Sequence, residues 1–575
     1  MEALSQTSAD TEDLLALGSP GGQNRRLTML FIDVVDSTAL SCRVEPETYW
    51  TVVGSYRRLV LNAAHELGGY IGFTKGDGLL VIFGHPVTHD NDVHRAVAMG
   101  MRVTAEVARL SAQVNRRFGF PIAVRIAIHR GMVYLDTERD EAYGGAVSLT
   151  QWMAGRAEPG TVVVSDAVAS LVGSQFELRG GTADYVKNTE SMIGYHRVLR
   201  ERDPRGTGER GPLVGRDRPR ARLARCWQRA QAHRLDVPGV MFRGGPGLGK
   251  SRLATAAEDL ARNSGKPVLR LSGSPLPTAA CLHPVRGLFD EAALPQHPDD
   301  VSPATVDAIR DRVLAHFGNG AGVLIVEDVH WLDPATLRVL DAVLSHSRGR
   351  LLVVMTSRTG LSLPGTWPVK VLDLQPMTET EADALVKILA PELPEPLRIA
   401  VRERSDGVPL YIEQIVAEIA RIGTDPGIET PMAVPDALYD ALLTDLDVSA
   451  PALPVLQAAA VIGRHVDRRV LCATLDLSDD ELDDVVDELE ERDILTPWGL
   501  DGWRFRRELI REIATELAPP SVLRELNSRL AEFLGQTAAD ATDWQRVGTH
   551  FERAELLDAA AAAFQRASDC ERSIA

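Results

Sequence analysis

Gly244-Gly-Pro-Gly-Leu-Gly249-Lys250-Ser251 follows the apolar run Val237–Phe242 and opens the amphipathic stretch Ser251–Asn263. In such a loop the glycines let backbone N–H groups surround phosphate oxygens, and the helix that follows directs its positive end toward them. Lys250 is expected to reach the terminal phosphates and the Ser251 hydroxyl to bind Mg²⁺. The stretch therefore predicts a nucleoside triphosphate site. Its expected binding residues are Gly244, Gly245, Pro246, Gly247, Leu248, Gly249, Lys250, Ser251 and Arg252.

A second run, Val323–Asp328, predicts an apolar strand that ends in two carboxylates, Glu327 and Asp328. One acid is expected to hold the water shell of the magnesium ion, and the other could polarise an attacking water. The sequence alone does not fix which acid does which. We favour Asp328 as the metal ligand and Glu327 as its support.

Apolar strands alternate with helices around these two motifs, which predicts a doubly wound parallel sheet over residues 212–430. The expected strands are 237–242, 268–271, 323–326 and 351–356, and the expected helices are 251–263 and 334–345. The alternative is a Gly-rich turn beside an ordinary buried strand. The presence of both motifs in the right order argues against it.

Four further segments accompany the loop: Pro212-Leu-Val-Gly-Arg216, Glu327-Asp-Val-His-Trp-Leu-Asp333, Thr356-Ser-Arg358 and Gly407-Val-Pro409. Together they resemble the signal-transduction ATPases with numerous domains (STAND class). The resemblance implies ATP and Mg²⁺ as cofactors, and adenine contacts from Val214, Gly215, Arg216 and Pro409. It also implies that Arg358 contacts the terminal phosphate, although an exposed arginine at a strand end is the alternative. The catalytic candidates are Lys250, Glu327, Asp328 and Arg358.

Residues 431–535 are mainly helical in pattern and resemble the winged-helix module of the same class. The expected helices are 442–456, 479–491 and 520–533. Where that class commonly has histidine, Phe505-Arg-Arg507-Glu-Leu509 has arginine, a permanent cation that can also reach a phosphate. The helix over 479–491 carries acids around the apolar seam Leu482, Val485, Val486 and Leu489. It would therefore repel DNA, and we expect no direct nucleic-acid binding.

The amino-terminal part contains Phe31-Ile-Asp33-Val-Val-Asp36, Gly76-Asp77-Gly78, Arg125-Ile-Ala-Ile-His129 and Tyr143-Gly-Gly-Ala-Val-Ser148. Two acids at strand ends, Asp33 and Asp77, could hold Mg²⁺ ions on a triphosphate. The arrangement resembles the class III nucleotide cyclase domain, an α+β fold, over about residues 25–198.

This domain departs from the family where the chemistry is demanding. Phe73 occupies the position at which the family has a lysine that reads the base, and the nearest lysine, Lys75, lies two residues further on. Glu141 would be the partner acid for the adenine. Ser148 and Trp152 replace the asparagine and the arginine that the family uses on ribose and phosphate. Loss of one charge-stabilising donor typically costs ~10²–10³ in rate. Asp36 also adds negative charge at the phosphate-facing turn, so we expect a degenerate, cyclase-like domain that binds a nucleotide or a partner domain.

Composition bounds the rest of the interpretation. The 575 residues include 62 Lys+Arg and 80 Asp+Glu, a formal net charge of −18, and five scattered cysteines. No signal peptide and no apolar run of 18 residues is evident, so a cytoplasmic protein with no membrane contact is expected. The expected organisation is a leader (1–24), the cyclase-like domain (25–199), a linker (200–211), the ATPase domain (212–430), the winged-helix module (431–535) and the start of a tetratricopeptide-like helical array (536–575).

The sequence thus predicts a multidomain α/β and all-α protein that acts as an ATP-driven signalling switch with slow turnover. Expected partners are ATP and ADP, a second cyclase-like domain or copy of the chain, and a protein whose identity the sequence does not reveal. Two alternatives remain open. One is a working adenylyl cyclase that uses Asp33 and Asp77, and the other is a transcription regulator that acts through partners.

Overall fold

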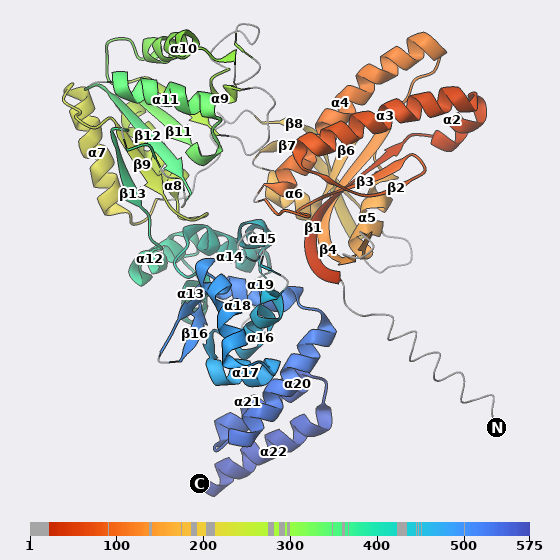
Figure 1. Ribbon diagram of the computed structural model, residues 1–575, viewed down its shortest axis with the longest axis vertical. Coiled ribbons are helices and arrows are strands. Elements are labelled where there is room, and N and C mark those ends of the chain that lie inside the picture. Colours follow the sequence, from red (N-terminus) through yellow and green to blue (C-terminus); the bar gives the residue numbers. More distant parts are fainter. Residues whose placement is uncertain are drawn as a thin grey trace. The chain divides into compact units, whose positions relative to one another are not determined.

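The computed structural model describes residues 22–89, 91–136, 141–173, 175–185, 192–202, 213–273, 281–286, 294–295, 300–347, 349–358, 361, 363–365, 367–422, 434–443, 446, 448–449, 451–499 and 501–574 (Figure 1). The chain forms two compact units. The first comprises residues 1–206 and 436–575, and the second comprises residues 207–435. In the described part of the chain, no helix has both the length and the apolar character to cross a bilayer.

An eight-stranded sheet with the order β2-β3-β1-β4-β6-β8-β7, and β5 beside β4, organises the amino-terminal part of the first unit. Its strands are β1 (Gly22–Val34), β2 (Tyr70–Lys75), β3 (Gly78–Phe83), β4 (Val124–Asp136), β5 (Glu141–Tyr143), β6 (Thr161–Ser165), β7 (Phe176–Tyr185) and β8 (Met192–Glu201). Its helices are α2 (Ser37–Arg43), α3 (Pro46–Leu67), α4 (Asp92–Phe118), α5 (Gly145–Ala154) and α6 (Asp166–Val172). The expected α+β organisation of this part, with helices packed on a mainly antiparallel sheet, is confirmed.

Alternation along β4 explains why helices cover both faces of this sheet. Ile126 and Ile128 lie against α4, where Gly100 lets the helix approach closely; a Cβ there would be 3.5 Å from each of these side chains. Ala127 points to the other face and packs with Met153 of α5. Figure 1 shows α3 and α4 side by side on one face of the sheet.

The second unit is built on a five-stranded parallel sheet with the order β10-β11-β12-β9-β13. Its strands are β9 (Gly239–Arg243), β10 (Val268–Ser272), β11 (Gly322–Glu327), β12 (Leu351–Ser357) and β13 (Val369–Asp373). Its helices are α7 (Asp217–Gln231), α8 (Lys250–Asn263), α9 (His283–Arg286), α10 (Pro303–His316), η3 (Val329–Trp331), α11 (Pro334–His346), α12 (Glu379–Leu389), α13 (Glu395–Ser405) and α14 (Pro409–Ile422). Consecutive residues of β9, β11 and β12 are buried, as in a sheet covered on both faces.

The carboxyl-terminal part of the first unit is mainly helical and contains a small antiparallel sheet, β14-β16-β15. Its elements are α15 (Asp436–Leu443), α16 (Ala452–Ile462), β14 (His465–Asp467), α17 (Arg468–Leu475), α18 (Asp479–Glu491), β15 (Leu495–Pro497), β16 (Gly502–Phe505), α19 (Glu508–Leu517), α20 (Pro520–Thr537), α21 (Ala541–Arg553) and α22 (Leu557–Ile574). In α18 most of the predicted seam is buried: Leu482, Val486 and Leu489 are buried, whereas Val485 is partly exposed.

The helix predicted over residues 442–456 is wrong. Helix α15 ends at Leu443, and α16 begins at Ala452 after Pro451. Proline disfavours helical conformation in the residue before it, so the apolar periodicity of this stretch does not belong to one continuous helix. Pro454 is tolerated because it lies in the first turn of α16, where the N–H groups have no partner within the helix.

A buried histidine lies where α21 packs on α20. His550 Nδ1 is 2.9 Å from Asn527 Oδ1, and the amide nitrogen of Asn527 donates to the Leu523 carbonyl at 2.7 Å. The amide oxygen therefore accepts from a neutral imidazole protonated at Nδ1. Burial, followed by the charges of Arg553 and Arg546, lowers the pKa of His550 from 6.5 to about 4.

The stability of this helical part should therefore fall as the pH is lowered from 6.5 toward 4. In this range the His550 imidazole binds a proton in the unfolded chain but not in the folded chain. The full effect is about 3 kcal/mol. Calorimetric melting of the full chain and of His550→Gln at several pH values tests this, and the advantage of the native chain should shrink in acid. A constant difference between the two proteins would contradict the assignment.

Candidate functional site

The loop Gly244–Ser251, here called the phosphate loop, connects β9 to α8. Gly247 and Gly249 adopt left-handed backbone conformations, with φ of 75° and φ of 87° respectively. Glycine adopts such conformations without steric cost. Helix α8 begins at Lys250, so its amino-terminal N–H groups lie at the loop. The Lys250 ammonium folds back and donates to the carbonyls of Gly244 at 2.9 Å and Gly245 at 2.7 Å.

Asp328 directly follows β11, and its charge interacts electrostatically with the Lys250 ammonium. Burial lowers the pKa of Lys250, and the Asp328 carboxylate opposes that shift. Burial, followed by the charge of Glu327, raises the pKa of Asp328, and Lys250 opposes this in turn. The Asp328 N–H donates to Thr356 Oγ1 at 2.9 Å. The structure therefore brings the lysine of the phosphate loop and the acid after β11 together.

Glu327 has a different environment. Arg270 of β10 donates to Glu327 Oε2 at 2.5 Å and to Glu258 Oε2 of α8 at 2.5 Å. The Glu327 side chain is 14% exposed and the Glu258 side chain 8% exposed. One guanidinium thus compensates two acids in a poorly solvated place. Glu327 is thus paired with Arg270, whereas Asp328 is the acid whose charge acts on Lys250.

Residues 214–216 lie against the phosphate loop. The Arg216 guanidinium donates to the Leu248 carbonyl at 3.2 Å and to the Gln375 carbonyl at 2.5 Å. Gly215 beside it has φ of 64°, a left-handed conformation that glycine adopts without steric cost. Glu381 Oε1 accepts the Arg216 N–H at 3.3 Å. Val214 precedes them and is partly exposed.

Residues 407–413 lie against the loop as well. The Leu410 N–H donates to the Gly247 carbonyl at 3.3 Å, directly after Pro409 opens α14. Arg252 of α8 pairs with Glu413 of α14 at 3.1 Å. The predicted adenine-side segments are thus both joined to the phosphate loop by hydrogen bonds.

The remaining candidates lie at the same edge of the sheet. Ser251 is exposed in the first turn of α8. Arg358 comes directly after Ser357 of β12, whose carbonyl accepts the Gly244 N–H at 3.2 Å, so the chain at Arg358 leaves the sheet beside the phosphate loop.

Sequence reasoning missed several contributors. His330 lies inside one of the quoted motifs, which assigned it no role; burial, followed by the charge of Lys250, lowers its pKa to about 4, so it stays neutral beside the lysine. Arg270 and Glu381 carry no motif. Only the register of β10 beside β11, where Arg270 pairs with Ile325, shows that Arg270 can reach a neighbouring acid.

A second pair of acids lies in the cyclase-like part. Asp33 is the second-last residue of β1, and Asp77 lies in the β2–β3 turn, where its Oδ2 accepts the Val34 N–H at 3.2 Å. Burial, followed by the charge of Asp77, raises the pKa of Asp33. Arg125, opposite Asp33 on β4, donates to its carboxylate at 3.1 Å and opposes this shift. The two acids are close, but one already has a cationic partner.

The positions that depart from the cyclase pattern have apolar or paired surroundings. Phe73 packs on Phe31, with ring centroids 6.4 Å apart. Trp152 lies under the Arg156 guanidinium, 3.7 Å from the ring centroid, and Arg156 pairs with Asp184 at 2.8 Å.

The remaining positions that differ from the cyclase pattern are Asp36, Ser148, Lys75 and Glu141. Asp36 is exposed and has φ of 52°, a backbone conformation that glycine favours. Ser148 is also exposed. The side chains of Lys75 and Glu141 lie outside the described residues.

Comparison with known families identifies both regions. Residues 22–197 match the adenylate and guanylate cyclase catalytic domain, and residues 212–354 match the AAA ATPase domain. The chain therefore joins a class III cyclase-like domain to an AAA-type ATPase domain.

Individual relatives are more distant. An uncharacterized protein of Rhizobium meliloti (strain 1021) is 26% identical over 622 residues, which is 95% of this chain and 59% of that protein. An adenylate cyclase of Anabaena cylindrica is 32% identical over 114 residues, 20% of this chain and 22% of that protein. The chain thus spans little more than half the length of the first relative and less than a quarter of the second. The crystal structure of the guanylyl cyclase Cya2 is 26% identical and covers 32% of this chain and 97% of its own, with a TM-score of 0.31.

Removal of the Arg270 charge tests the contribution of its two ion pairs. Arg270→Met leaves Glu327 without its cation and Glu258 with only the more exposed Arg262, and we expect a loss of about 2–4 kcal/mol in unfolding free energy. The matched control is Arg229→Met, which breaks the exposed pair with Asp236 and should cost less than about 1 kcal/mol. Urea-induced unfolding of the full chain measures both, and equal losses would show that the Arg270 pairs have no special role.

Proposed function

We propose that this protein is a signalling switch of the STAND type that binds ATP with Mg²⁺ in residues 212–430 and hydrolyses it slowly. The observation that carries the proposal is the phosphate loop between β9 and α8, in which Lys250 folds onto the loop carbonyls and its charge and that of Asp328 act on each other. The match to an AAA ATPase domain supports it.

The residues present fit a magnesium triphosphate. Mg²⁺ prefers hard oxygen ligands, and the Ser251 hydroxyl and the Asp328 carboxylate would provide them. Lys250 would exchange its hydrogen bonds to loop carbonyls for phosphate oxygens, which are stronger acceptors because they are charged. Glu327 is held by Arg270 and would act as support, and Arg358 would contact the terminal phosphate.

Nucleotide state would be transmitted through the segments joined to the loop. Arg216 binds the Leu248 carbonyl, and Leu410 binds the Gly247 carbonyl. A loop that closes on phosphate would shift both acceptors and so favour one arrangement of the segments that follow. The coupling is reciprocal, so a partner that moves residues 407–413 would change nucleotide affinity.

We further propose that the cyclase-like domain is degenerate and serves as a regulatory or pairing module. Trp152 offers no cation at the position that the cyclase pattern gives to arginine, and the arginine stacked on it is paired with Asp184. Its partner would be a second copy of this chain or another cyclase-like domain.

A second candidate is an active adenylate cyclase. The proximity of Asp33 and Asp77 favours it, because two neighbouring carboxylates could share metal ions on a triphosphate. The likeness to the Anabaena cylindrica adenylate cyclase points the same way.

Two substitutions separate binding from turnover. Lys250→Ala should weaken ATP binding roughly a hundredfold or more, since charge-assisted contacts to phosphate are lost. Asp328→Ala should keep binding but abolish hydrolysis. Lys266→Ala, an exposed lysine of the same unit, is the matched control. Calorimetric titration with ATP·Mg²⁺ and a phosphate-release assay measure both steps, and native affinity in Lys250→Ala would refute the site.

A cyclase assay separates the two candidates. The purified full chain should form no cyclic AMP from ATP with Mg²⁺ or Mn²⁺ over a range of protein concentrations, because the charge-stabilising arginine is missing. Product that disappears in Asp33→Ala would instead establish the cyclase.

A further inference from the structure

One face of helix α7 carries a row of arginines. Their spacing of four, three and four residues places them on the same side of the helix. They are Arg218, Arg222, Arg225 and Arg229, here called the basic stripe. The opposite side of α7 carries the buried Leu223, Trp227 and Ala230. Arg222 is partly exposed and the other three arginines are exposed, so the basic stripe lies on the surface.

Most of the basic stripe is unpaired. Arg229 lies 3.1 Å from Asp236, and both side chains are exposed. Within the described part of the chain, the side chains of the other three arginines have neither a hydrogen bond nor an ion pair, and the Nε atom of Arg222 is buried without a partner. Such cations can bind anionic groups that come from another molecule.

The three unpaired arginines line a groove between α7 and the end of β13. Three acids also line this groove, namely Asp217, Asp373 and Glu381. Asp373 pairs with Arg243 at 2.6 Å, and Asp217 lies 3.8 Å from Arg220. Glu381 accepts the N–H of the residue that caps α12 at 2.9 Å. Each acid thus has its own partner, and the charge that remains uncompensated in the groove is positive, although the whole chain has a net charge of −18.

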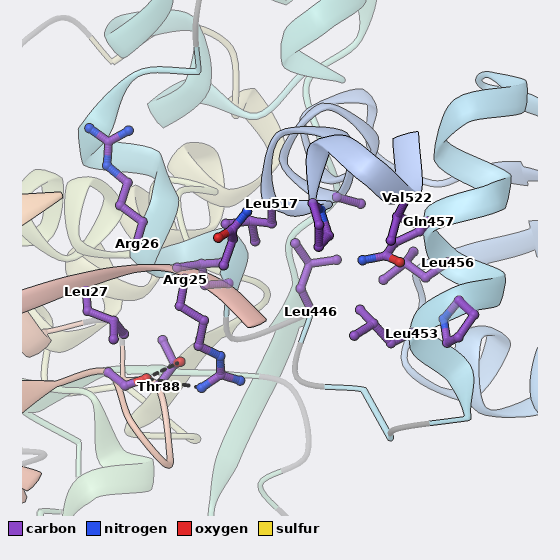
Figure 2. Close-up of a pocket in the computed structure, with 16 residues that line it drawn as sticks. Arg25, Arg26, Leu27, Thr88, Leu446, Leu453, Leu456, Gln457, Leu517 and Val522 are labelled. Carbon is purple, nitrogen blue, oxygen red and sulfur yellow. Dashed lines mark hydrogen bonds between the residues drawn. The ribbon is translucent and has the colours of Figure 1, made fainter. Parts of the chain in front are cut away.

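The arginines at the cavity of the first unit differ, because the protein itself engages them. This cavity lies between the start of β1 and the mainly helical part, and Figure 2 shows Arg25 and Arg26 beside it. Arg25 Nη1 donates to the Gly84 carbonyl at 3.4 Å. The Arg26 guanidinium lies 4.6 Å from the centre of the Tyr439 ring and 3.9 Å from Glu516. The three arginines of α7 have no comparable partners among the described residues.

Helix α18 carries a row of acids with the same spacing of four, three and four residues. They are Asp480, Asp484, Asp487 and Glu491, here called the acidic stripe, and all four are exposed. No side chain of this stripe has an ion pair or a hydrogen bond to another described residue. Neighbouring acids of α18 do have partners. Asp483 pairs with Arg468 at 2.7 Å, and Glu490 accepts from Trp503 at 2.7 Å. The acidic stripe therefore remains available to a cationic surface.

We propose that the basic stripe of one copy of this chain binds the acidic stripe of a second copy. Both stripes extend over eleven residue steps, about 16 Å along a helix that rises about 1.5 Å per residue. The spacing reads the same in both directions, so every arginine meets an acid whether the two helices run parallel or antiparallel. Each stripe repels a second copy of itself, so the contact joins α7 of one copy to α18 of the other. In a dimer with two-fold symmetry this contact forms twice.

Salt should weaken this association. A single exposed ion pair contributes little to affinity, but four pairs in register act together and fix which surfaces meet. The screening length falls from about 10 Å in about 0.1 M salt to about 3 Å in about 1 M salt, so the dissociation constant of the self-association should rise roughly tenfold or more over this range. The inference does not rest on nucleotide binding, because neither stripe includes a residue of the phosphate loop.

Charge reversal in the full chain tests the contact. One triple variant reverses the basic stripe and another the acidic stripe: Arg218→Glu, Arg222→Glu and Arg225→Glu, and Asp480→Lys, Asp484→Lys and Asp487→Lys. Each should weaken self-association roughly tenfold or more, because like charges then face each other. An equimolar mixture of the two variants should restore it, since each reversed stripe then meets a stripe of opposite charge.

The matched control reverses three exposed arginines of α4, with the same change in net charge: Arg109→Glu, Arg116→Glu and Arg117→Glu. This variant should self-associate as the native chain does. Analytical ultracentrifugation over a range of protein concentrations measures all four proteins and the mixture.

Three results would overturn the proposal: a native chain that stays monomeric, self-association that neither stripe variant weakens, or a mixture of the two variants that stays dissociated. The second result would assign self-association to another surface, such as the cyclase-like domain, and the third would mean that the stripes do not meet between copies. If a triple variant does not fold, Arg218→Gln with Arg225→Gln should still weaken self-association, and native affinity there would also refute the contact. Without nucleotide, the Lys250→Ala protein should self-associate as the native chain does, so failure of this contact and failure of the nucleotide site can be told apart.

Discussion

A half-buried ammonium and a half-buried carboxylate, close enough for each charge to act on the other, form the central constraint in the second unit. Loss of solvation lowers the pKa of Lys250 and raises the pKa of Asp328. The charge of each group partly opposes the pKa shift of the other. The free energy lost when two charges are desolvated exceeds the attraction between them unless the pair has ideal geometry. The arrangement is therefore typical of a site that binds further charged groups. The loop carbonyls that accept from Lys250 are weaker acceptors than phosphate oxygens. Exchange of these carbonyls for phosphate oxygens as hydrogen-bond partners of Lys250 would therefore be favourable.

The two acid pairs of the chain differ in where the nearby arginine binds. In the ATPase domain, Arg270 compensates Glu327 and leaves Asp328 to face the phosphate loop. In the cyclase-like domain, Arg125 compensates Asp33, one of the two acids that would hold metal. A cation already paired with a metal-binding acid competes with the metal for the same oxygens. The same residue types are therefore paired differently in the two domains.

The sequence was sufficient where one local motif carries the whole arrangement. The strand, turn and helix around Gly244–Ser251 could be predicted because the apolar run, the glycines and the start of the helix lie within one short segment. The pairing of Arg270 with two acids could not be predicted, since it depends on parallel pairing between strands that are distant in the sequence and leaves no pattern of its own. The prediction of one helix over residues 442–456 was wrong because a local pattern was given too much weight. The apolar periodicity is present, but the second helix begins only after Pro451.

Main-chain contacts explain how the loop can be coupled to its neighbours without a conspicuous side-chain pattern. Arg216 binds the carbonyl of Leu248, and the Leu410 N–H binds the carbonyl of Gly247, so neither acceptor depends on the identity of a side chain. The absence of a side chain does matter at Gly247, where a Cβ would lie 2.9 Å from the Leu410 Cβ. The glycine thus serves two needs at once: it turns the loop and lets residues 407–413 approach it. Any movement of the loop on binding phosphate would reach that segment directly, because no intervening side chain can absorb it.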